Sequence, residues 1–296
     1  MTGLLLVDKP VGVTSHDVVD HLRRAAGLRR IGHTGTLDPN ATGLLILCLG
    51  AATRLSEHLT GLDKTYEGVM RLGVVTESYD LDGAVVEEHP VPVLDLASLQ
   101  EACNRYAGDI QQIPPMVSAV KVGGERLYRK ARKGEVIERE PRSVTVHEFT
   151  VLAYNEPDAH VRVRCTSGTY VRSLCHDVGQ DLGCGGALAT LRRTMVGKFS
   201  VEDAAPMDTF QDEQSVADRL MSMDTALDLP EVRVGREGRA MVGTGGTLGI
   251  SELSTKCPVR GGWVQVKSES GELLALGTVE PTAMGVLVHP KRVFLK

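Results

Sequence analysis

The sequence predicts an α+β protein with a large first part and a small β-rich end. Continuous apolar runs at residues 4–7 and 43–50 are typical of strands that are buried on both faces. Two alternating runs, 143–154 and 159–167, are typical of the paired strands of a hairpin. The glycine-rich end from about residue 232 adds short strand patterns, and 296 residues allow one large domain and a small one.

Helices are predicted between these strands. Ser15 can cap a helix that stops at Gly27 and whose apolar positions share one face: Val18, Val19, Leu22 and Ala26. A strand is expected within 65–75 and a helix over 97–106. A further helix, over 170–182, is predicted from apolar residues at helical spacing: Val171, Leu174, Val178 and Leu182.

A strongly basic segment covers residues 121–142. It holds eight Lys or Arg against four Glu. A strand is expected over 117–122, and 125–133 has a helical pattern that is polar nearly all round, so this helix should pack weakly and project. Such a charge run is typical of a solvated face, and it is also what a phosphate-binding surface requires.

The net charge of −5 is unevenly distributed. Residues 200–231 hold nine Asp or Glu and one Arg, and they are predicted to form an acidic connector with a short helix. Residues 232–296 hold nine Lys or Arg against five Glu. Because phosphate binding depends on local charge, the acidic total does not exclude a nucleic-acid partner.

The cysteines indicate a reducing compartment. All six are scattered without a C-x-x-C pair, which argues against a disulfide framework and against a zinc ribbon. The nine histidines form no cluster with metal-ligand spacing, so no metal is expected. Neither a signal sequence nor an apolar run long enough for a membrane span is evident, and the cytoplasm is the expected location.

The loop at 32–43, GHTGTLDPNATG, contains the most informative residue, Asp38. Pro39 disfavours a helical conformation at Asp38, and the surrounding glycines let backbone or ligand approach closely. The loop also precedes a buried strand, a common position for site residues. Since most Asp-Pro turns are structural, these residues alone favour a turn-forming Asp38 over a catalytic one.

The same loop closely resembles the catalytic signature of the bacterial tRNA pseudouridine-55 synthases, the TruB family. The resemblance extends over about residues 3–199, with further motifs in the family's order: 3–15 (GLLLVDKPVGVTS), 63–66 (DKTY), 71–73 (RLG), 80–83 (DLDG), 112–121 (QIPPMVSAVK), 167–172 (SGTYVR) and 191–193 (LRR). Any one of these motifs alone is a weak signal. Several of them in the right order are a strong one.

The resemblance implies a fold and a domain plan. The fold is the α+β pseudouridine synthase fold, with a large mixed, mostly antiparallel sheet flanked by helices. The catalytic domain would cover 1–205, with the basic insertion at 121–142 acting as an RNA-gripping thumb. An acidic connector at 206–231 would lead to a small module at 232–296 that resembles an RNA-binding PUA domain.

The resemblance also implies a reaction, the isomerisation of uridine 55 in the T loop of tRNA, which needs no cofactor or metal. Asp38 matches the family's essential carboxylate, and an ionised carboxylate suits chemistry at a ribosyl carbon. It must stay ionised in a dry site, which calls for a nearby cation. Arg172 of the SGTYVR motif is the candidate. On the residues alone, a solvent-facing arginine would be the better interpretation.

The remaining predicted site residues would hold a flipped-out uridine or the tRNA. Tyr66 matches the family's tyrosine that packs on the base and is a candidate for proton transfer, and flipped bases are held by such stacking. Tyr170 and Leu191 would form further walls, and His33 would fill the space that the base leaves. The RNA backbone would be contacted by the cations of the insertion: Arg126, Arg129, Lys130, Arg132 and Lys133.

Two other functions remain open from the sequence. A hydrolase would normally need a second carboxylate at a defined distance, and the matched motifs provide none for that role. A non-catalytic tRNA-binding or tRNA-folding protein would need only the basic patches. For the synthase that the resemblance implies, the expected partner is tRNA, through its T stem-loop. The chain is expected to act as a monomer without an obligate protein partner and without a membrane.

Overall fold

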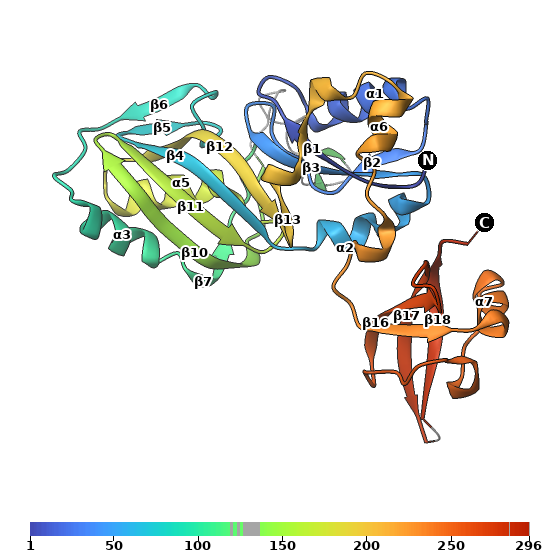
Figure 1. Cartoon of the computed structure of the whole chain (residues 1–296). Helices are drawn as coiled ribbons and strands as arrows, with labels where there is room; N and C mark the ends of the chain where they lie inside the picture. The colour runs from blue at the N-terminus through green and yellow to red at the C-terminus, as the bar shows by residue number, and fades with distance from the viewer. Residues whose placement is uncertain (119–120, 123–124, 127–136, 284, 296) are drawn as a thin grey trace.

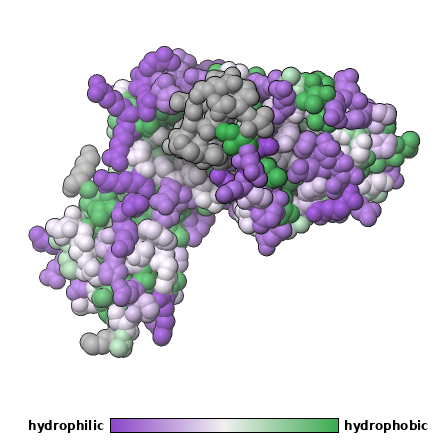
Figure 2. Space-filling model, turned by 180° about the vertical axis from the view of Figure 1, so that it is seen from behind, coloured by the Kyte–Doolittle hydropathy of each residue, from purple (hydrophilic) through white to green (hydrophobic). Residues whose placement is uncertain are grey.

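The protein is an elongated molecule with a large sheet structure and a small sheet module at one end (Figure 1). It is described here by a computed structural model that covers residues 1–118, 121–122, 125–126, 137–283 and 285–295. Figure 2 shows the opposite face, on which hydrophobic residues form separate small patches in a largely hydrophilic surface.

A mixed sheet organises the first part. Among the described residues it has ten strands, in the order β14-β1-β3-β12-β4-β11-β10-β7, with β13 paired to β12 and β2 paired to β3. Only the β1–β14 and β3–β12 pairs are parallel. The strands are β1 (Gly3–Lys9), β2 (Ile31–His33), β3 (Thr42–Leu49), β4 (Lys64–Leu72), β7 (Gly108–Gln112), β10 (Arg142–Asn155), β11 (Asp158–Cys165), β12 (Gly186–Val196), β13 (Phe199–Ser200) and β14 (Ala205–Pro206). The predicted large, mostly antiparallel sheet is confirmed.

Helices cover the two halves of this sheet separately. Among the described residues of this part, the helices are α1 (Ser15–Ala25), α2 (Ser56–Thr60), α3 (Leu96–Asn104), α5 (Val171–Asp181) and α6 (Glu213–Asp218). Helices α3 and α5 share one buried apolar cluster with β4, β10 and β11, whereas α1 and α6 share another with β1 and β3 (Figure 1). The cap of α1 is Thr14, one residue before the predicted Ser15, because the Thr14 and Asp17 side chains form a capping box.

Short elements connect these parts. A hairpin of β5 (Val74–Thr76) and β6 (Val85–Glu88) follows β4. Short 3₁₀ helices occur in the connections: η1 (Gly50–Leu55), η2 (Val201–Asp203), η3 (Met207–Thr209), η4 (Met223–Thr225) and η5 (Ile250–Glu252). The acidic stretch is more than a linker, since β14 pairs with β1 and the Phe210 side chain is fully buried beside α1.

The basic insertion differs from its prediction where it is described. Of the expected strand over 117–122, the described residues 121–122 form β8 (Lys121–Val122), and the chain bends at 117–118. The expected helix over 125–133 is wrong at its start, because β9 (Glu125–Arg126) pairs with β8 as a short hairpin. A helix that is polar all round has no apolar face to pack against the core, so the sequence pattern does not favour helix over strand here. The backbone hydrogen bonds of the hairpin then determine the structure. Residues 127–133 lie outside the described residues.

The two halves of the sheet meet where β12 runs beside both β3 and β4. Arg193 of β12 pairs with Gly43 on one side and with Tyr66 on the other. A side chain at Gly43 would place its Cβ 2.3 Å from the Arg193 carbonyl oxygen, and Gly43 has a φ of 100°. Glycine is therefore required at this crossing, and the loop that precedes β3 is held against β4 and β12.

The small module has a sheet of its own. It consists of β15 (Glu231–Val234), β16 (Gly262–Ser268), β17 (Leu273–Thr282) and β18 (Gly285–Val293), in that order across the sheet, with α7 (Arg236–Gly243) packed on it. This sheet confirms the predicted β-rich end. One buried cluster spans both parts of the molecule, because Leu273, Leu276 and Phe294 lie with side chains of β1 and β3.

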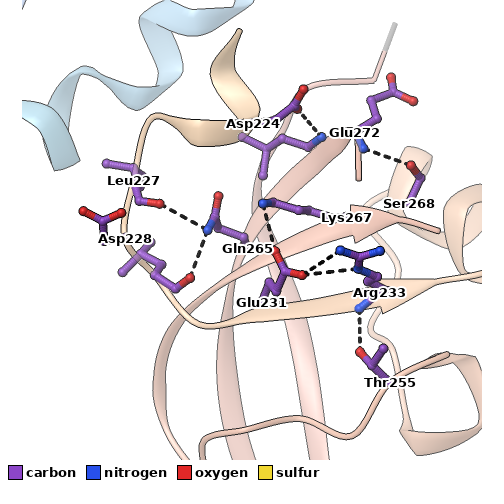
Figure 3. A network of polar contacts seen from close by, with 12 residues as sticks. Asp224, Leu227, Asp228, Glu231, Arg233, Thr255, Gln265, Lys267, Ser268 and Glu272 are labelled. Carbon is purple, nitrogen blue, oxygen red and sulfur yellow. Dashed lines mark hydrogen bonds and ion pairs between the residues drawn. The ribbon is translucent and has the colours of Figure 1, made fainter. Parts of the chain in front are cut away.

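Polar contacts join the module to the chain that enters it (Figure 3). The buried Gln265 amide donates to the carbonyl oxygens of Leu227 and Leu229, at 3.3 and 2.9 Å. The Asp224 carboxylate accepts from the Leu273 backbone at 2.6 Å. Since amides and carbonyls buried without partners are costly, these contacts hold residues 224–229 in one position on the module.

Two further features concern the cysteines and the helices of the described residues. The six cysteines are free, and five of them are buried. None of the helices in the described part of the chain has the length and apolar character of a membrane span.

Helix α5 carries a partly buried acid, Asp177, from which a stability prediction follows. Burial, with the nearby charge of Asp181, raises the pKa of Asp177 from 3.8 to about 6. The native state thus binds a proton that the unfolded state releases between about pH 4 and 6, and stability falls across that window as the pH rises. At pH 8 the native state must hold Asp177 in its charged form, which costs free energy of folding, and solvent screening reduces this cost because Asp177 is partly exposed. The neutral amide of Asp177→Asn avoids the cost, so we expect it to stabilise the fold at pH 8 by about 1 kcal/mol.

This gain should nearly vanish at pH 3, where the wild-type carboxyl is protonated in both states. Denaturant unfolding at the two pH values measures it. Glu101→Gln, the same exchange on the exposed face of α3, is the matched control and should show no such gain. An Asp177→Asn gain that is equal at both pH values would contradict the assignment.

Candidate active site

The Asp38 loop is held on both sides by side chains that bind its backbone. The Ser15 hydroxyl accepts from the Leu37 amide at 2.9 Å and donates to the Leu37 carbonyl at 3.1 Å. The Pro39 carbonyl accepts from the Lys9 ammonium at 3.0 Å and from the Gly12 amide at 2.9 Å. Leu37 is buried, whereas the Asp38 side chain is 51% exposed. The loop thus presents the carboxylate to solvent from a fixed backbone.

A buried arginine pairs with this carboxylate. Nη2 of Arg172, in the first turn of α5, lies 2.9 Å from Oδ2 of Asp38. The Arg172 side chain is only 5% exposed, and it also donates to the Ser78 carbonyl at 3.0 Å and to the Val117 carbonyl at 2.8 Å. The structure therefore brings together the predicted carboxylate and its predicted cation.

Arg172 also pairs with a second carboxylate, that of Asp80, which was not predicted as a site residue. Nη1 of Arg172 lies 3.3 Å from Oδ2 of Asp80, in the turn after β5. Burial raises the pKa of Asp80, while hydrogen bonding from Ser78 and the charge of Arg172 oppose the rise. The DLDG motif was a possible signal, but a turn is what such residues usually form. One arginine is thus shared between an exposed and a mostly buried carboxylate.

The predicted apolar and aromatic walls lie on adjacent strands. Leu191 on β12 pairs with Gly68 of β4, and Tyr66 lies two residues earlier on β4. Both side chains are partly buried against the cluster under α5. Burial raises the pKa of Tyr66, a hydrogen bond and the charge of Arg193 oppose the rise, and the Asp38 charge adds to it. Tyr66 is therefore within electrostatic reach of Asp38.

Tyr170 is fixed through its backbone. The Gln112 amide side chain accepts from the Tyr170 N–H at 2.7 Å and donates to the Tyr170 carbonyl at 3.0 Å. Burial raises the pKa of the Tyr170 hydroxyl, the charge of Arg172 opposes the rise, and the Asp38 charge adds to it. Gln112 is a site residue that the sequence did not reveal, because a glutamine at a strand end has no distinctive pattern.

The other predicted site residues are less closely tied to the carboxylate. His33 is the last residue of β2 and begins the loop that leads to Asp38. Arg126 lies in β9, but its side chain is outside the described residues, as are four further predicted RNA-backbone contacts: Arg129, Lys130, Arg132 and Lys133. No cluster of three His, Cys, Asp or Glu side chains suited to a metal is found in the described part of the chain.

Family profiles match most of this chain. The profile of the TruB family pseudouridylate synthases, N-terminal domain, matches residues 23–171, and that of the tRNA pseudouridylate synthase B C-terminal domain matches residues 172–228. The chain belongs to the TruB family. It is therefore an isomerase that forms pseudouridine in tRNA, and the resemblance seen in its motifs is confirmed.

Curated relatives in the TruB family cover nearly the same length. The "tRNA pseudouridine synthase B" of Opitutus terrae is 50% identical over 78% of this chain and 90% of its own length. That of Thermobifida fusca is 45% identical over 81% and 85%. That of Synechococcus sp. strain WH7803 is 40% identical over 99% and 97%.

Solved structures share the fold of this TruB family member. The chain is similar to one in an H/ACA RNP bound to a substrate RNA that contains 2′-deoxyuridine, with a TM-score of 0.77, 26% identity and coverage of 99% of this chain and 85% of that chain. A chain in a Cbf5-Nop10-Gar1 complex gives a TM-score of 0.77 and 28% identity at the same coverages. The predicted pseudouridine synthase fold is confirmed.

Proposed function

We propose that this isomerase acts on uridine 55 in the T loop of tRNA, with Asp38 as the catalytic carboxylate. The observation that carries the proposal is the Asp38–Arg172 pair. A cation that is 5% exposed holds a carboxylate that is 51% exposed, at 2.9 Å, on a loop with a fixed backbone. A surface ion pair that served stability alone would contribute little and would need no buried partner.

The reaction demands such a group. The bond between N1 and C1′ of uridine breaks, the uracil turns, and a bond forms between C5 and C1′. An ionised carboxylate beside the sugar can act as a nucleophile or as an electrostatic partner for a ribosyl carbon. Asp38 would face the sugar, since its oxygen is exposed and Arg172 orients it from behind.

The base must leave the T loop before it can react. Flipped bases are held by stacking and by apolar side chains. Tyr66 and Leu191 provide such surfaces on adjacent strands, and Tyr170 provides a third beside Arg172. His33 would take the place that the base leaves in the loop. Tyr66 would also accept the proton that C5 loses.

The rest of the chain would bind the tRNA. The catalytic domain would span 1–205 with its thumb at 121–142, joined through 206–231 to a PUA-like RNA-binding module at 232–296. The module carries nine Lys or Arg against five Glu, a balance that suits phosphate contacts. The five cations of the thumb would contribute further backbone contacts. The protein would work as a monomer in the cytoplasm, without an obligate protein partner.

Tritium release from tRNA transcripts that carry 5-tritiated uridine tests the proposal. We expect stoichiometric release from a transcript with uridine 55, since C5 loses its hydrogen when it joins the sugar. A transcript with cytidine at position 55 should release none. Release from the cytidine transcript would contradict the T-loop assignment. Binding without any release would favour a tRNA-folding protein, and free uracil among the products would favour a hydrolase.

A further inference from the structure

Three cations are buried around the Asp38 loop without a carboxylate partner. Lys9, Lys64 and Arg193 are 0, 5 and 1% exposed. The ion pairs found among the described residues include none of them, although Arg172 nearby has two. Instead, each donates to backbone carbonyls, those of Pro39 for Lys9, Thr60 for Lys64 and Gly35 for Arg193 among them.

Buried cations without a carboxylate partner lower the stability of a fold. A buried charge is normally paired, because hydrogen bonds to carbonyls replace only part of its hydration. Its cost is visible in the lysines: burial, together with the charge of Arg193, lowers the pKa of both Lys9 and Lys64 to about 8. An unbalanced positive charge at this position therefore calls for a role in the site.

Arg193 is the member of this group that contacts a proposed reacting residue. It pairs with Tyr66 across β12 and β4, so both side chains lie on the same face of the sheet. Its guanidinium donates to the Leu44 carbonyl at 2.7 Å and to the Gly35 carbonyl at 3.1 Å, and it lies near enough to the Tyr66 hydroxyl to oppose the rise in the pKa of that group. One planar group thus ties the tyrosine to the loop that carries Asp38.

We propose that Arg193 is a positioning residue of the isomerisation. Its planar guanidinium group orients the Tyr66 hydroxyl toward the base, and its positive charge, which no carboxylate balances, stabilises the anionic form of that oxygen. The inference rests on the proposed function, in which Tyr66 takes the C5 proton. Tyr66 is faced by Arg193 from β12, by Cys165 from β11 and by Asp38 from the loop before β3. Only the first of these carries a positive charge.

The proton balance of the reaction explains the need for this charge. After C5 has joined C1′, the C5–H bond breaks and its electron pair forms the C5–C6 double bond, while the C6–N1 double bond opens and N1 takes a proton from solvent. The proton lost from C5 passes to the phenolate oxygen of Tyr66. Burial alone makes that phenolate unfavourable. A fixed cation beside the oxygen favours it, as preorganised donors do at other sites of developing charge.

Arg193→Met and Arg193→Lys test the inference in tritium release under single-turnover conditions. We expect the rate to fall about 100-fold with Met and about 10-fold with Lys, which keeps the charge but not the planar guanidinium group. The Kd for tRNA should change by less than about threefold, because Arg193 is buried. With Arg193→Met, a primary deuterium isotope effect should appear with 5-deuterated uridine, and the rise of rate with pH should move to higher pH.

A double-mutant cycle separates this role from simple support of the loop. In a Tyr66→Phe background, Arg193→Met should change the rate by less than about threefold, because its partner oxygen is gone. Arg162→Met is the matched control, since Arg162 lies on β11 with its guanidinium paired to Glu67 at 2.8 Å and 43% exposed. It should leave the isotope effect and the pH profile unchanged.

Several outcomes would overturn the inference. Equal losses with Met and Lys and no isotope effect would reduce Arg193 to a support of the loop. Additive losses in the Tyr66→Phe background would do the same. If Arg193→Met did not fold, the pH profile of Arg193→Lys would decide, and an unchanged profile would refute the inference. Wild-type release by Tyr66→Phe would refute it while leaving Asp38 in its role, whereas absence of release from the wild type would instead refute the proposed function.

Discussion

Asp38→Asn should abolish pseudouridine formation while the protein still folds and binds tRNA. The amide has nearly the same shape, but it lacks the anionic oxygen that acts at the sugar. We therefore expect the single-turnover rate of tritium release to fall by at least about 10⁴-fold. Since the carboxylate is half-exposed, its pair with Arg172 contributes only about 0–1 kcal/mol to stability. The Kd for tRNA should stay within about threefold, because phosphate contacts dominate affinity.

Asp158→Asn is the matched control for this variant. Asp158 also pairs with an arginine, Arg71, but at the start of β11 and away from Asp38. It should retain the wild-type rate. Turnover by Asp38→Asn at more than a tenth of the wild-type rate would remove Asp38 from its proposed role.

Arg172→Met should reduce both activity and stability. The substitution leaves Asp80, whose side chain is only 17% exposed, without its cation, and unpaired buried charges are strongly destabilising. We expect a loss of about 2–4 kcal/mol in the free energy of unfolding. We expect the rate to fall about 1,000-fold, because Asp38 loses the donor that orients it.

A second substitution separates these two effects. Adding Asp80→Asn to Arg172→Met removes the unpaired acid and should restore most of the lost stability, as measured by denaturant unfolding, but not the rate. Arg71→Met, which breaks the exposed pair with Asp158, is the control for loss of an arginine and should leave the rate intact. Recovery of the rate in the double variant would show that Arg172 serves only to balance Asp80.

Much of the fold was predictable because its elements carry strong patterns. The apolar run of β3, the alternation of β10 and β11, and the amphipathic faces of α1 and α5 all appear where they were predicted. The hairpin of β8 and β9 was not, because polar residues leave helix and strand almost equally favourable. Pairing partners such as β12 beside β3 depend on contacts distant in sequence, which periodicity does not contain.

For the candidate site, the sequence motifs predicted the residues proposed to act on the substrate, but not the residues that hold them in place. Asp38, Tyr66, Arg172 and Leu191 were named from the resemblance, whereas their residues alone favoured structural roles. The supporting groups were missed, because a lysine, a glutamine or an arginine that binds carbonyls looks like any surface residue in a sequence. Lys9, Gln112 and Arg193 show their function only through burial and through the groups they hold.

The apolar cluster shared by the small module and the first part makes the module an integral member of the fold. Cutting the chain before β15 would remove Leu273, Leu276 and Phe294 from the buried cluster to which side chains of β1 and β3 also belong, and would leave part of that cluster exposed to water. We expect the truncated chain to aggregate through this exposed apolar surface and not to behave as a smaller enzyme. In the full-length chain, we expect heating to unfold both parts in one cooperative transition. Trp263, the sole tryptophan, lies edge-on to His58 of α2 with their ring centroids 4.6 Å apart, so its fluorescence would report this unfolding transition.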